Sequence, residues 1–536
     1  MKYGFVIDNR KCIGCHACTT ACKSEHDVPV GVNRTWVKQV EKGEFPNSRR
    51  LFSVMRCNHC TDAPCVNICP TSALFTRADG IVDFDKDRCI GCKSCMQACP
   101  YDALYIDPQT QTAAKCNYCA HRVDVGLEPA CVNVCPEQAI ISGDMDDPSS
   151  EISGLLARLP VTARKPEKGT QPNLFYIDAD EASLNPSSTP DTGEYLWSSQ
   201  NLGVGHFAKE AEKMAFSNED AVTALIEKQA APADGDAPMR SVEVIMGKKA
   251  RRVYDSPDKG ILWGWEVSAY VWTKAISAGV FLVLFLATIC GLAQPSAATQ
   301  IWTYGLGLTF LAITGLLLIK DLDQPWRFAY VMLRPHWGSW LVKGGYAISA
   351  YGGLLTLLAI CWFFDLEVIG KIGFWATGAA GLVVAIYTAF LFGQCKGRDF
   401  WQSPALAVHM LVHSFMAGAA TLALVAMVSA ASGEWMHYLK LVLLVGIGVN
   451  LLTMFIELTA VHPTVDSHRV AKMITKGRYA KTFYLGILLL GNLVPFGLLL
   501  FVSAWPILAV AAVAVLIGIY FTEHVWVEAP QRIELS

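Results

Sequence analysis

Sixteen of the nineteen cysteines lie between Cys12 and Cys135, in four groups whose spacing suits metal-cluster chemistry. The groups are Cys12, Cys15, Cys18 and Cys22; Cys57, Cys60, Cys65 and Cys69; Cys89, Cys92, Cys95 and Cys99; and Cys116, Cys119, Cys131 and Cys135. The first and third follow the Cys-x2-Cys-x2-Cys-x3-Cys pattern, in which three close thiolates wrap one cluster and the fourth reaches another. The four groups together predict four 4Fe–4S clusters.

Two other uses of cysteine fit the pattern less well. Cys-x2-Cys pairs also build zinc ribbons, but a zinc site needs no third cysteine at the same short spacing. A disulfide framework belongs to exported proteins. The first residues, Met1 to Asp8, contain neither a long apolar run nor a twin-arginine pair, so we expect no secretory signal. The other cysteines, Cys290, Cys361 and Cys395, lie within or beside apolar runs, where a thiol is usually a small hydrophobic group.

The elements that hold the cysteines are duplicated. Arg-x-Cys-Ile-Gly-Cys around Cys12 returns as Asp-Arg-Cys-Ile-Gly-Cys around Cys89, and Cys65-Val-Asn-Ile-Cys-Pro returns as Cys131-Val-Asn-Val-Cys-Pro. Residues 73–84 read as a hairpin with an Asp79-Gly80 turn. We therefore expect a ferredoxin-like α+β domain over residues 1–145, with two duplicated cluster-binding units. Residues 146–264 are predicted to be an irregular connecting segment, because their composition is typical of loops.

The second half of the chain is strongly apolar and predicts an all-α membrane domain over residues 265–530. Eight runs are long enough to cross a bilayer. They cover about residues 267–292, 299–320, 339–363, 372–393, 403–430, 438–462, 482–503 and 506–526. The composition is 52% hydrophobic and the net charge is −3, which gives no basic surface for nucleic acid.

Lysine and arginine are distributed unequally between the two predicted sides of the membrane. The side that carries the cysteine domain has fourteen of them, and the other side has two, Lys371 and Lys440. Cytoplasmic loops carry the excess of positive residues. We therefore expect a multi-pass protein of the bacterial inner membrane with its iron–sulfur domain in the cytosol.

Several ionisable or polar side chains lie inside the predicted spans, near the cytosolic side. They are Glu266, Tyr270, Lys274, Asp321, Tyr387, His409 and Glu457. Such groups are costly in lipid and are functional by default, although aromatic residues and lysines also occur at membrane surfaces without another role. Acids and tyrosines beside an electron-transfer path suit quinone chemistry, in which electrons and protons meet at one apolar ring. We predict that these residues bind quinone or transfer its protons.

The cysteine half resembles the four-cluster subunits of the dimethyl sulfoxide reductase superfamily. That resemblance implies crosswise ligation. One cluster would be held by Cys12, Cys15, Cys18 and Cys135; its partner by Cys22, Cys116, Cys119 and Cys131; the third by Cys57, Cys60, Cys65 and Cys99; and the fourth by Cys69, Cys89, Cys92 and Cys95. It also implies a separate catalytic subunit with molybdopterin or tungstopterin.

The membrane half resembles the NrfD/polysulfide reductase anchors, on the stretches that begin at Trp265, Asp321 and Tyr387. The resemblance implies an eight-helix anchor without haem, with a site for menaquinone or ubiquinone beside a cluster. Tyr387 and Glu457 would lie near the quinone. The fusion of the two parts in one chain departs from many relatives and favours obligate electron passage between them.

The leading hypothesis is an electron-transfer and quinone-reacting subunit, embedded in membrane lipid and working with a separate catalytic chain. Three alternatives stay open: a nickel–iron hydrogenase as the partner, a redox-driven proton-translocating module, and a b-type cytochrome. The last would use His409 and His413, four residues apart, with His462 and His524 near other span ends.

Overall fold

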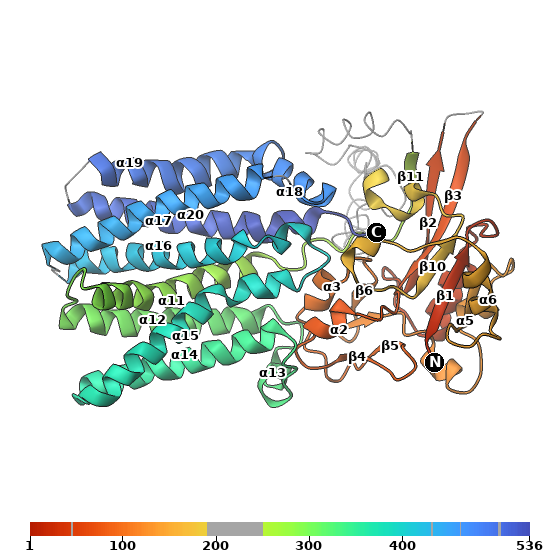
Figure 1. Cartoon of the computed structure of the whole chain (residues 1–536), viewed down its shortest axis with the longest axis horizontal. Coiled ribbons are helices and arrows are strands. Elements are labelled where there is room, and N and C mark those ends of the chain that lie inside the picture. The colour runs from red at the N-terminus through yellow and green to blue at the C-terminus, as the bar shows by residue number, and fades with distance from the viewer. Residues whose placement is uncertain (44–46, 190–249, 430–431, 461, 502–504) are drawn as a thin grey trace, which may run out of the picture. The chain divides into compact units, whose positions relative to one another are not determined.

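The computed structural model describes residues 1–43, 47–189, 250–429, 432–460, 462–501 and 505–536. Two compact units make up the chain (Figure 1). The first contains Met1–Leu262 and the tail Glu534–Ser536, and the second contains Trp263–Ile533. The predicted order, an α+β unit followed by an all-helical membrane unit, is confirmed.

A four-stranded sheet forms the middle of the first unit. Strand β1 (Tyr3–Asp8) lies between β8 (Ile140–Asp144), which runs antiparallel to it, and β10 (Leu174–Ile177), which runs parallel. Strand β9 (Val161–Thr162) completes the sheet beside β10. Because β1 and β10 are inner strands, their apolar side chains are almost completely buried, and they supply much of the core.

A second, antiparallel sheet has the order β11-β2-β3. Its strands are β11 (Ala250–Tyr254), β2 (Thr35–Lys42) and β3 (Arg49–Arg56). Side chains of β2 and β3, including Trp36 and Val54, share one hydrophobic core with Phe5 and Leu174 of the first sheet. The two sheets are therefore packed into one body.

Among the described residues, two hairpins and seven short α-helices complete the first unit. The hairpins are β4 (Leu74–Thr76) with β5 (Val82–Phe84) and β6 (Leu104–Asp107) with β7 (Thr112–Lys115). The helices are α1 (Ala17–Glu25), α2 (Pro64–Ile68), α3 (Ser94–Ala98), α4 (Ala120–Val123), α5 (Ala130–Asn133), α6 (Glu151–Arg158) and α7 (Glu181–Leu184). The hairpin predicted over residues 73–84 is present, and Gly80 takes the positive φ of 80° that its turn requires.

The prediction of an irregular segment over residues 146–264 is wrong for much of the part of this segment that the structure describes. Residues 151–184 contain α6, β9, β10 and α7, and β11 follows at residues 250–254. Strand β10 lies next to β1, and β11 pairs with β2, so these residues belong to the iron–sulfur unit. Pairing partners so distant in sequence leave no local signal. Residues 190–249 of the predicted segment lie outside the described residues.

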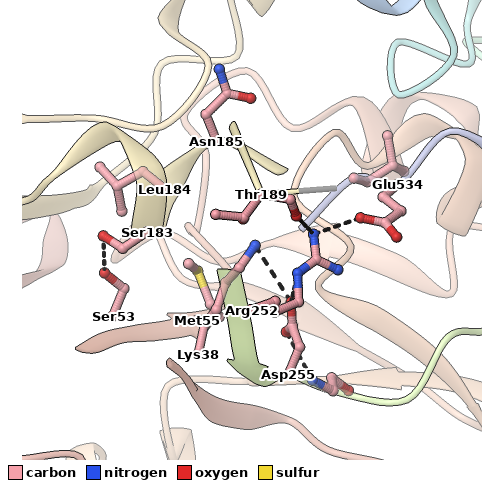
Figure 2. Close-up of polar contacts among 12 residues, drawn as sticks. Lys38, Ser53, Met55, Ser183, Leu184, Asn185, Thr189, Arg252, Asp255 and Glu534 are labelled. Carbon is pink, nitrogen blue, oxygen red and sulfur yellow. Dashed lines mark hydrogen bonds and ion pairs between the residues drawn. The ribbon is translucent and has the colours of Figure 1, made fainter. Parts of the chain in front are cut away.

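Buried charges bind β11 and the carboxy-terminal tail into the first unit (Figure 2). Asp255 lies 3.4 Å from Lys38 Nζ and 3.6 Å from Arg252 Nε. The Arg252 guanidinium also pairs with Glu534 of the tail at 2.6 Å. Because ions are costly to bury unless they are paired, these contacts hold the three segments together.

The described part of the second unit contains eight helices long and apolar enough to cross a membrane. They are α11 (Trp265–Cys290), α12 (Ala297–Lys320), α14 (Trp340–Phe363), α15 (Glu367–Gly393), α16 (Ala405–Val428), α17 (Gly433–Thr459), the π-helical η6 (Thr482–Leu493) continuing into α19 (Val494–Phe501), and α20 (Trp505–Glu528). The predicted number of spans is confirmed. Shorter helices α13 (Tyr330–Leu333) and α18 (Val465–Thr475) lie in connections between them.

Helix α11 contributes to two hydrophobic cores among the described residues of the membrane unit. One core joins it to α12, α14 and α15, and the other to α16, α17, α19 and α20. The backbones of α11 and α16 touch at Gly279 and Gly418, where a Cβ on Gly279 would lie 1.8 Å from the Ser414 carbonyl oxygen. Small residues allow such close helix contact in membranes. This contact fixes the part of α16 that carries the histidines.

Candidate cluster-binding centres and membrane site

The first and third cysteine groups have the same backbone geometry. Gly14 and Gly91 each have φ of 69°, and His16 and Lys93, two residues later, have φ of 60° and 58°. These left-handed residues curl each loop in the same way before the short helix begins. The sequence repeat is therefore also a structural repeat.

Two cavities are lined by cysteines from different groups. One is lined by Cys12, Cys15 and Cys18 together with Cys135. The other is lined by Cys89, Cys92 and Cys95 together with Cys69. In each, three thiols come from one loop and the fourth comes from another part of the chain.

The remaining eight cysteines form two sets, one around Cys22 and one around Cys65, and the two sets also interact with each other through Cys57 and Cys116. Cys22 interacts with Cys116, Cys119 and Cys131, and burial is the main cause that raises its pKa. Cys65 interacts with Cys57, Cys60 and Cys99, and burial again raises its pKa well above the ordinary value. Buried thiols of this kind are unfavourable as free thiolates and suit a cationic metal centre that stabilises them.

Backbone and side-chain donors point at several sulfurs. The amides of His59 and Ala139 donate to the thiols of Cys57 and Cys135, at 3.4 and 3.3 Å. His26 Nε2 lies 3.2 Å from Cys119 Sγ, and burial lowers the pKa of His26 to about 4. Hydrogen bonds to ligand sulfur are among the interactions that set the reduction potential of a bound cluster.

Arg56 is a fully buried cation among the thiols. Its Nη1 donates to Cys131 Sγ at 3.0 Å, and its guanidinium carbon lies 4.6 Å from the centroid of the Phe5 ring. Burial alone would lower the pKa of Arg56, but the thiolates of Cys131, Cys116 and Cys18 raise it above its ordinary value.

Buried donors without a partner mark where an anionic group fits. Nε and Nη2 of Arg56 have no hydrogen-bond partner among the described residues. His59 Nδ1 accepts the Val82 amide at 3.2 Å, so the hydrogen lies on Nε2, which is likewise unpartnered in the described chain. Since unpaired buried donors are costly, the donor set and the thiols fit sulfide-containing clusters.

In the membrane unit, Lys274 of α11 and Tyr387 of α15 lie together. Lys274 Nζ donates to Thr388 Oγ1 at 2.7 Å and to the Ala385 carbonyl at 3.2 Å, and it lies 4.8 Å from the Tyr387 ring centroid. Tyr270 is buried one turn before Lys274 on the same helix. Three of the predicted residues therefore share one buried neighbourhood.

His409 and Glu457 form a second pair, between α16 and α17. His409 Nδ1 lies 2.9 Å from Glu457 Oε2, and the Trp526 indole donates to the same oxygen at 3.1 Å. One turn deeper, His413 contacts Glu523 at 2.6 Å and Asn450 at 3.1 Å. All of these side chains are buried.

The other two predicted residues lie at the ends of their helices, Glu266 in the first turn of α11 and Asp321 after the last turn of α12. Glu266 is partly exposed and pairs with Lys320 at 3.6 Å. Asp321 caps the end of α12 and is also partly exposed. Sequence reasoning did not find Glu523, although an acid inside an apolar run is itself a signal, and it considered His413 only as a haem ligand.

Comparison with protein families divides the chain close to the boundary between the two structural units. Residues 11–74 and 49–145 match two 4Fe-4S dicluster domain families. Residues 256–533, about half of the chain, match the family described as Polysulphide reductase, NrfD.

Curated relatives resemble the first third of the chain. A tetrathionate reductase subunit of Salmonella typhimurium is 46% identical over 190 residues, which are 34% of this chain and 76% of that protein. A polysulfide reductase subunit of Wolinella succinogenes is 45% identical over 181 residues, 33% of this chain and 94% of that protein. An arsenate respiratory reductase iron–sulfur subunit of a Shewanella species is 35% identical over 225 residues, 33% of this chain and 96% of that protein.

The matches and the structure agree on both halves of the molecule. The cysteine unit binds 4Fe–4S clusters, and the helical unit is a multi-pass membrane domain. The chain thus belongs to the NrfD/polysulfide reductase family, as an iron–sulfur electron-transfer subunit fused to its membrane anchor.

Proposed function

We propose that the chain carries electrons through four 4Fe–4S clusters between a separate catalytic subunit and quinone in the membrane. The observation that carries this proposal is the presence, in one polypeptide, of four sets of thiols, most of them buried, and a membrane unit with buried Lys274, His409 and Glu457. Because the clusters and the membrane unit are parts of one chain, we expect electrons to pass between the clusters and a redox partner in the membrane.

Crosswise ligation is supported by the thiol sets. Each of the two cavities gathers three cysteines of one group and one of another, as does each of the two interacting sets. When bound, the clusters supply one-electron redox chemistry. The thiols hold them, and Arg56 and the backbone amides stabilise the charge on the sulfurs.

The partner is proposed to be a molybdopterin or tungstopterin enzyme. Its support is the names of the relatives, which are subunits of tetrathionate, polysulfide and arsenate reductases. The loop charges favour a position of the iron–sulfur unit in the cytosol, at the bacterial inner membrane.

Quinone chemistry is proposed for the polar residues of the membrane unit. Reduction of a quinone takes up two electrons and two protons. Lys274, Tyr270 and Tyr387 supply a cationic, hydrogen-bonding neighbourhood for a quinone oxygen, while His409 and Glu457 hold exchangeable protons. Glu266 and Asp321 complete the proposed set nearer the membrane surface.

The composition of the native complex tests the clusters and the partner together. The purified complex is expected to contain about sixteen iron atoms and as many acid-labile sulfides per copy of this chain, beyond any in the partner. Molybdenum or tungsten is expected with the large subunit. Iron for only two clusters would contradict the four-cluster proposal, and nickel in place of molybdenum or tungsten would identify a hydrogenase partner.

A further inference from the structure

Two neighbouring series of hydrogen bonds join buried side chains of four membrane helices: one contains His409 and Glu457, and the other contains Glu523, His413, Asn450 and Asn492. His409 and His413 lie on α16, Asn450 and Glu457 on α17, Glu523 on α20, and Asn492 on the π-helical η6. All six are buried. Because each donor in such a series requires an acceptor, the positions of the hydrogens can be assigned from one end.

The deep end of the series that contains His413 fixes the orientation of two side-chain amides, those of Asn492 and Asn450. Asn492 Nδ2 donates to the backbone carbonyl of Ile487 at 2.8 Å, and a carbonyl can only accept. Asn492 Oδ1 therefore accepts from Asn450 Nδ2 at 2.9 Å. Asn450 Oδ1 then accepts at 3.1 Å from His413 Nε2, which must carry a hydrogen.

This assignment leaves a proton between His413 and Glu523. Nδ1 of a neutral His413 with hydrogen on Nε2 is an acceptor, and so is an ionised carboxylate. Yet His413 Nδ1 and Glu523 Oε1 are only 2.6 Å apart. Two acceptors at this distance need a shared proton, so the pair holds one more proton than neutral histidine and carboxylate contain together.

His409 has the complementary arrangement. Glu457 Oε2 accepts the Trp526 indole hydrogen at 3.1 Å and lies 2.9 Å from His409 Nδ1, which donates to the ionised carboxylate. His409 Nε2 is then a buried lone pair, with no hydrogen-bond partner in the part of the chain that the structure describes. An unpaired lone pair costs less here than an unpaired charged N–H would.

A nitrogen of the His409 ring lies near the shared proton. One nitrogen or oxygen atom each from His409, His413 and Glu523 lies within 4.8 Å of the others, and the two imidazole centroids are 4.2 Å apart. A single water can bridge a gap of that size. Lys274 of α11 also interacts electrostatically with Glu523, which couples the pair to the proposed quinone residues.

We propose that His413 and Glu523 store one proton and that His409 relays it to Glu457. The proton moves to His409 Nε2, and the hydrogen on His409 Nδ1 moves to the Glu457 carboxylate. His409 stays neutral with its hydrogen now on Nε2, Glu523 is left ionised, and no electron moves. This inference rests on the proposed function, in which the stored proton serves quinone reduction.

Protons enter and leave the proposed relay at one end only. At the deep end the hydrogen-bond series stops at the Asn492 amide, whose donor is taken by a backbone carbonyl and which cannot accept and release a proton as imidazole does. Glu457 lies close to the end of α17, which ends at Thr459, whereas Asn450 lies deeper in that helix. Protons are therefore loaded and released at the Glu457 end, and the described side chains form no continuous path across the membrane.

The same three residues could be read as a metal site, but the distance argues against that. Ligands of one tetrahedral ion, at bonds of about 2.0–2.1 Å, stand more than about 3 Å apart. The 2.6 Å contact between His413 and Glu523 is shorter. A shared proton explains it, and a shared ion does not.

Nitrogen-15 solid-state NMR of the full-length protein in lipid, labelled at histidine, tests the proton positions directly. His409, assigned from the signal lost in His409→Gln, is expected to be protonated on Nδ1 only. His413 is expected to lose its shared-proton signature in Glu523→Gln. Protonation of His409 on Nε2, an unchanged His413 signal in Glu523→Gln, or a stoichiometric transition metal outside the clusters would overturn the proposal.

A kinetic experiment tests the relay. Protein with pre-reduced clusters is mixed with menaquinone, which needs protons, or with ferricyanide, which does not. Glu523→Gln is expected to slow oxidation by menaquinone at least tenfold and to leave oxidation by ferricyanide unchanged. Thr522→Val, which removes only a hydroxyl bonded to the Gly518 carbonyl of its own helix, is the matched control and is expected to change neither rate.

The outcomes separate the two proposals. If Glu523→Gln slows cluster oxidation equally with menaquinone and with ferricyanide, Glu523 has a structural role and the relay is contradicted. An unchanged rate of oxidation by menaquinone also contradicts the relay. If the unaltered protein is oxidised by ferricyanide but not by menaquinone, the proposed quinone function fails, while the NMR result still decides whether the proton store exists.

Discussion

At the scale of single residues, the cysteine unit combines sixteen thiols with a buried cation. Arg56 ends strand β3 and reaches Cys131, a thiol of the set that also contains Cys22. The cysteine spacing predicted the thiols, because the spacing of the loops is itself the ligand pattern. Arg56 could not be predicted, because its place among the thiols depends on the pairing of β2 with β3.

Replacing Arg56 with methionine is expected to lower the potential of the adjacent clusters. Reduction adds negative charge, and a buried guanidinium that donates to the ligand sulfur stabilises the reduced form. Loss of one charged hydrogen bond corresponds to a fall in reduction potential on the order of 50 mV for a one-electron couple. A redox titration followed by electron paramagnetic resonance measures it. Arg56→Lys, which keeps the charge, is expected to shift the potential less, and equal potentials in all three proteins would contradict this role.

Replacing Cys22 with serine tests the crosswise ligation. Cys22 lies in the first sequence group but interacts with the thiols of the fourth. The variant is therefore expected to alter the resonance signal of the cluster held by Cys116, Cys119 and Cys131 and to preserve the signal of the cluster held by Cys12. The opposite result would show that each group binds its own cluster. Cys290→Ser, at an exposed thiol outside the four groups, is the control.

At the scale of elements, local patterns predicted the hairpin at Asp79-Gly80 and the eight spans, because turn chemistry and apolar length are local properties. They did not predict β10 or β11, whose partners are β1 and β2. The sequence did not predict the pairing of His413 with Glu523 for the same reason, because these residues are 110 positions apart and meet only when α16 packs against α20.

The contact between α11 and α16 predicts a steric effect. A Cβ on Gly418 would lie 2.1 Å from the carbonyl carbon of Gly279, so Gly418→Ala must separate the two helices. Overpacking of this kind costs about 1–3 kcal/mol. A lower midpoint of thermal unfolding in detergent is expected. Gly448→Ala, on α17 with open space around the new methyl group, should unfold at the same temperature as the unaltered protein. Equal unfolding midpoints for the two variants would contradict the close contact between α11 and α16.

The ion cluster of Figure 2 predicts a dependence of stability on pH. Burial, and after it the Arg252 guanidinium, lowers the pKa of Lys38 to about 7, from an ordinary 10.5. Between these values the unfolded state binds more protons than the folded state, so stability rises with pH, by up to about 1.4 kcal/mol per pH unit. The midpoint of thermal loss of cluster absorbance is expected to rise from pH 7 to pH 9.

Lys38→Met should remove this dependence, because methionine does not titrate. Lys42, on the same strand and partly exposed, pairs with Asp180, and Lys42→Met is the matched control. The control is expected to keep the rise with pH. A rise of the same size in Lys38→Met would show that another group is responsible.

At the scale of the whole molecule, the two units bring two kinds of chemistry into one polypeptide. The first unit holds clusters in a domain completed by the tail Glu534–Ser536, which follows the last membrane helix. The second is a family anchor whose buried polar groups lie among apolar helices. The composition predicted this division, and the family matches confirmed it. The chemical link between the units, electron exchange with quinone, is the central proposal.

Equilibration of the clusters with quinone tests that proposal most directly. The full-length protein, with its clusters intact, is placed in lipid nanodiscs that contain menaquinone or menaquinol, and cluster reduction is followed by electron paramagnetic resonance. Menaquinone is expected to oxidise the reduced clusters, or menaquinol to reduce the oxidised ones, until the two couples reach one potential. Clusters that react with ferricyanide and dithionite, but with neither menaquinone nor menaquinol, would contradict the account.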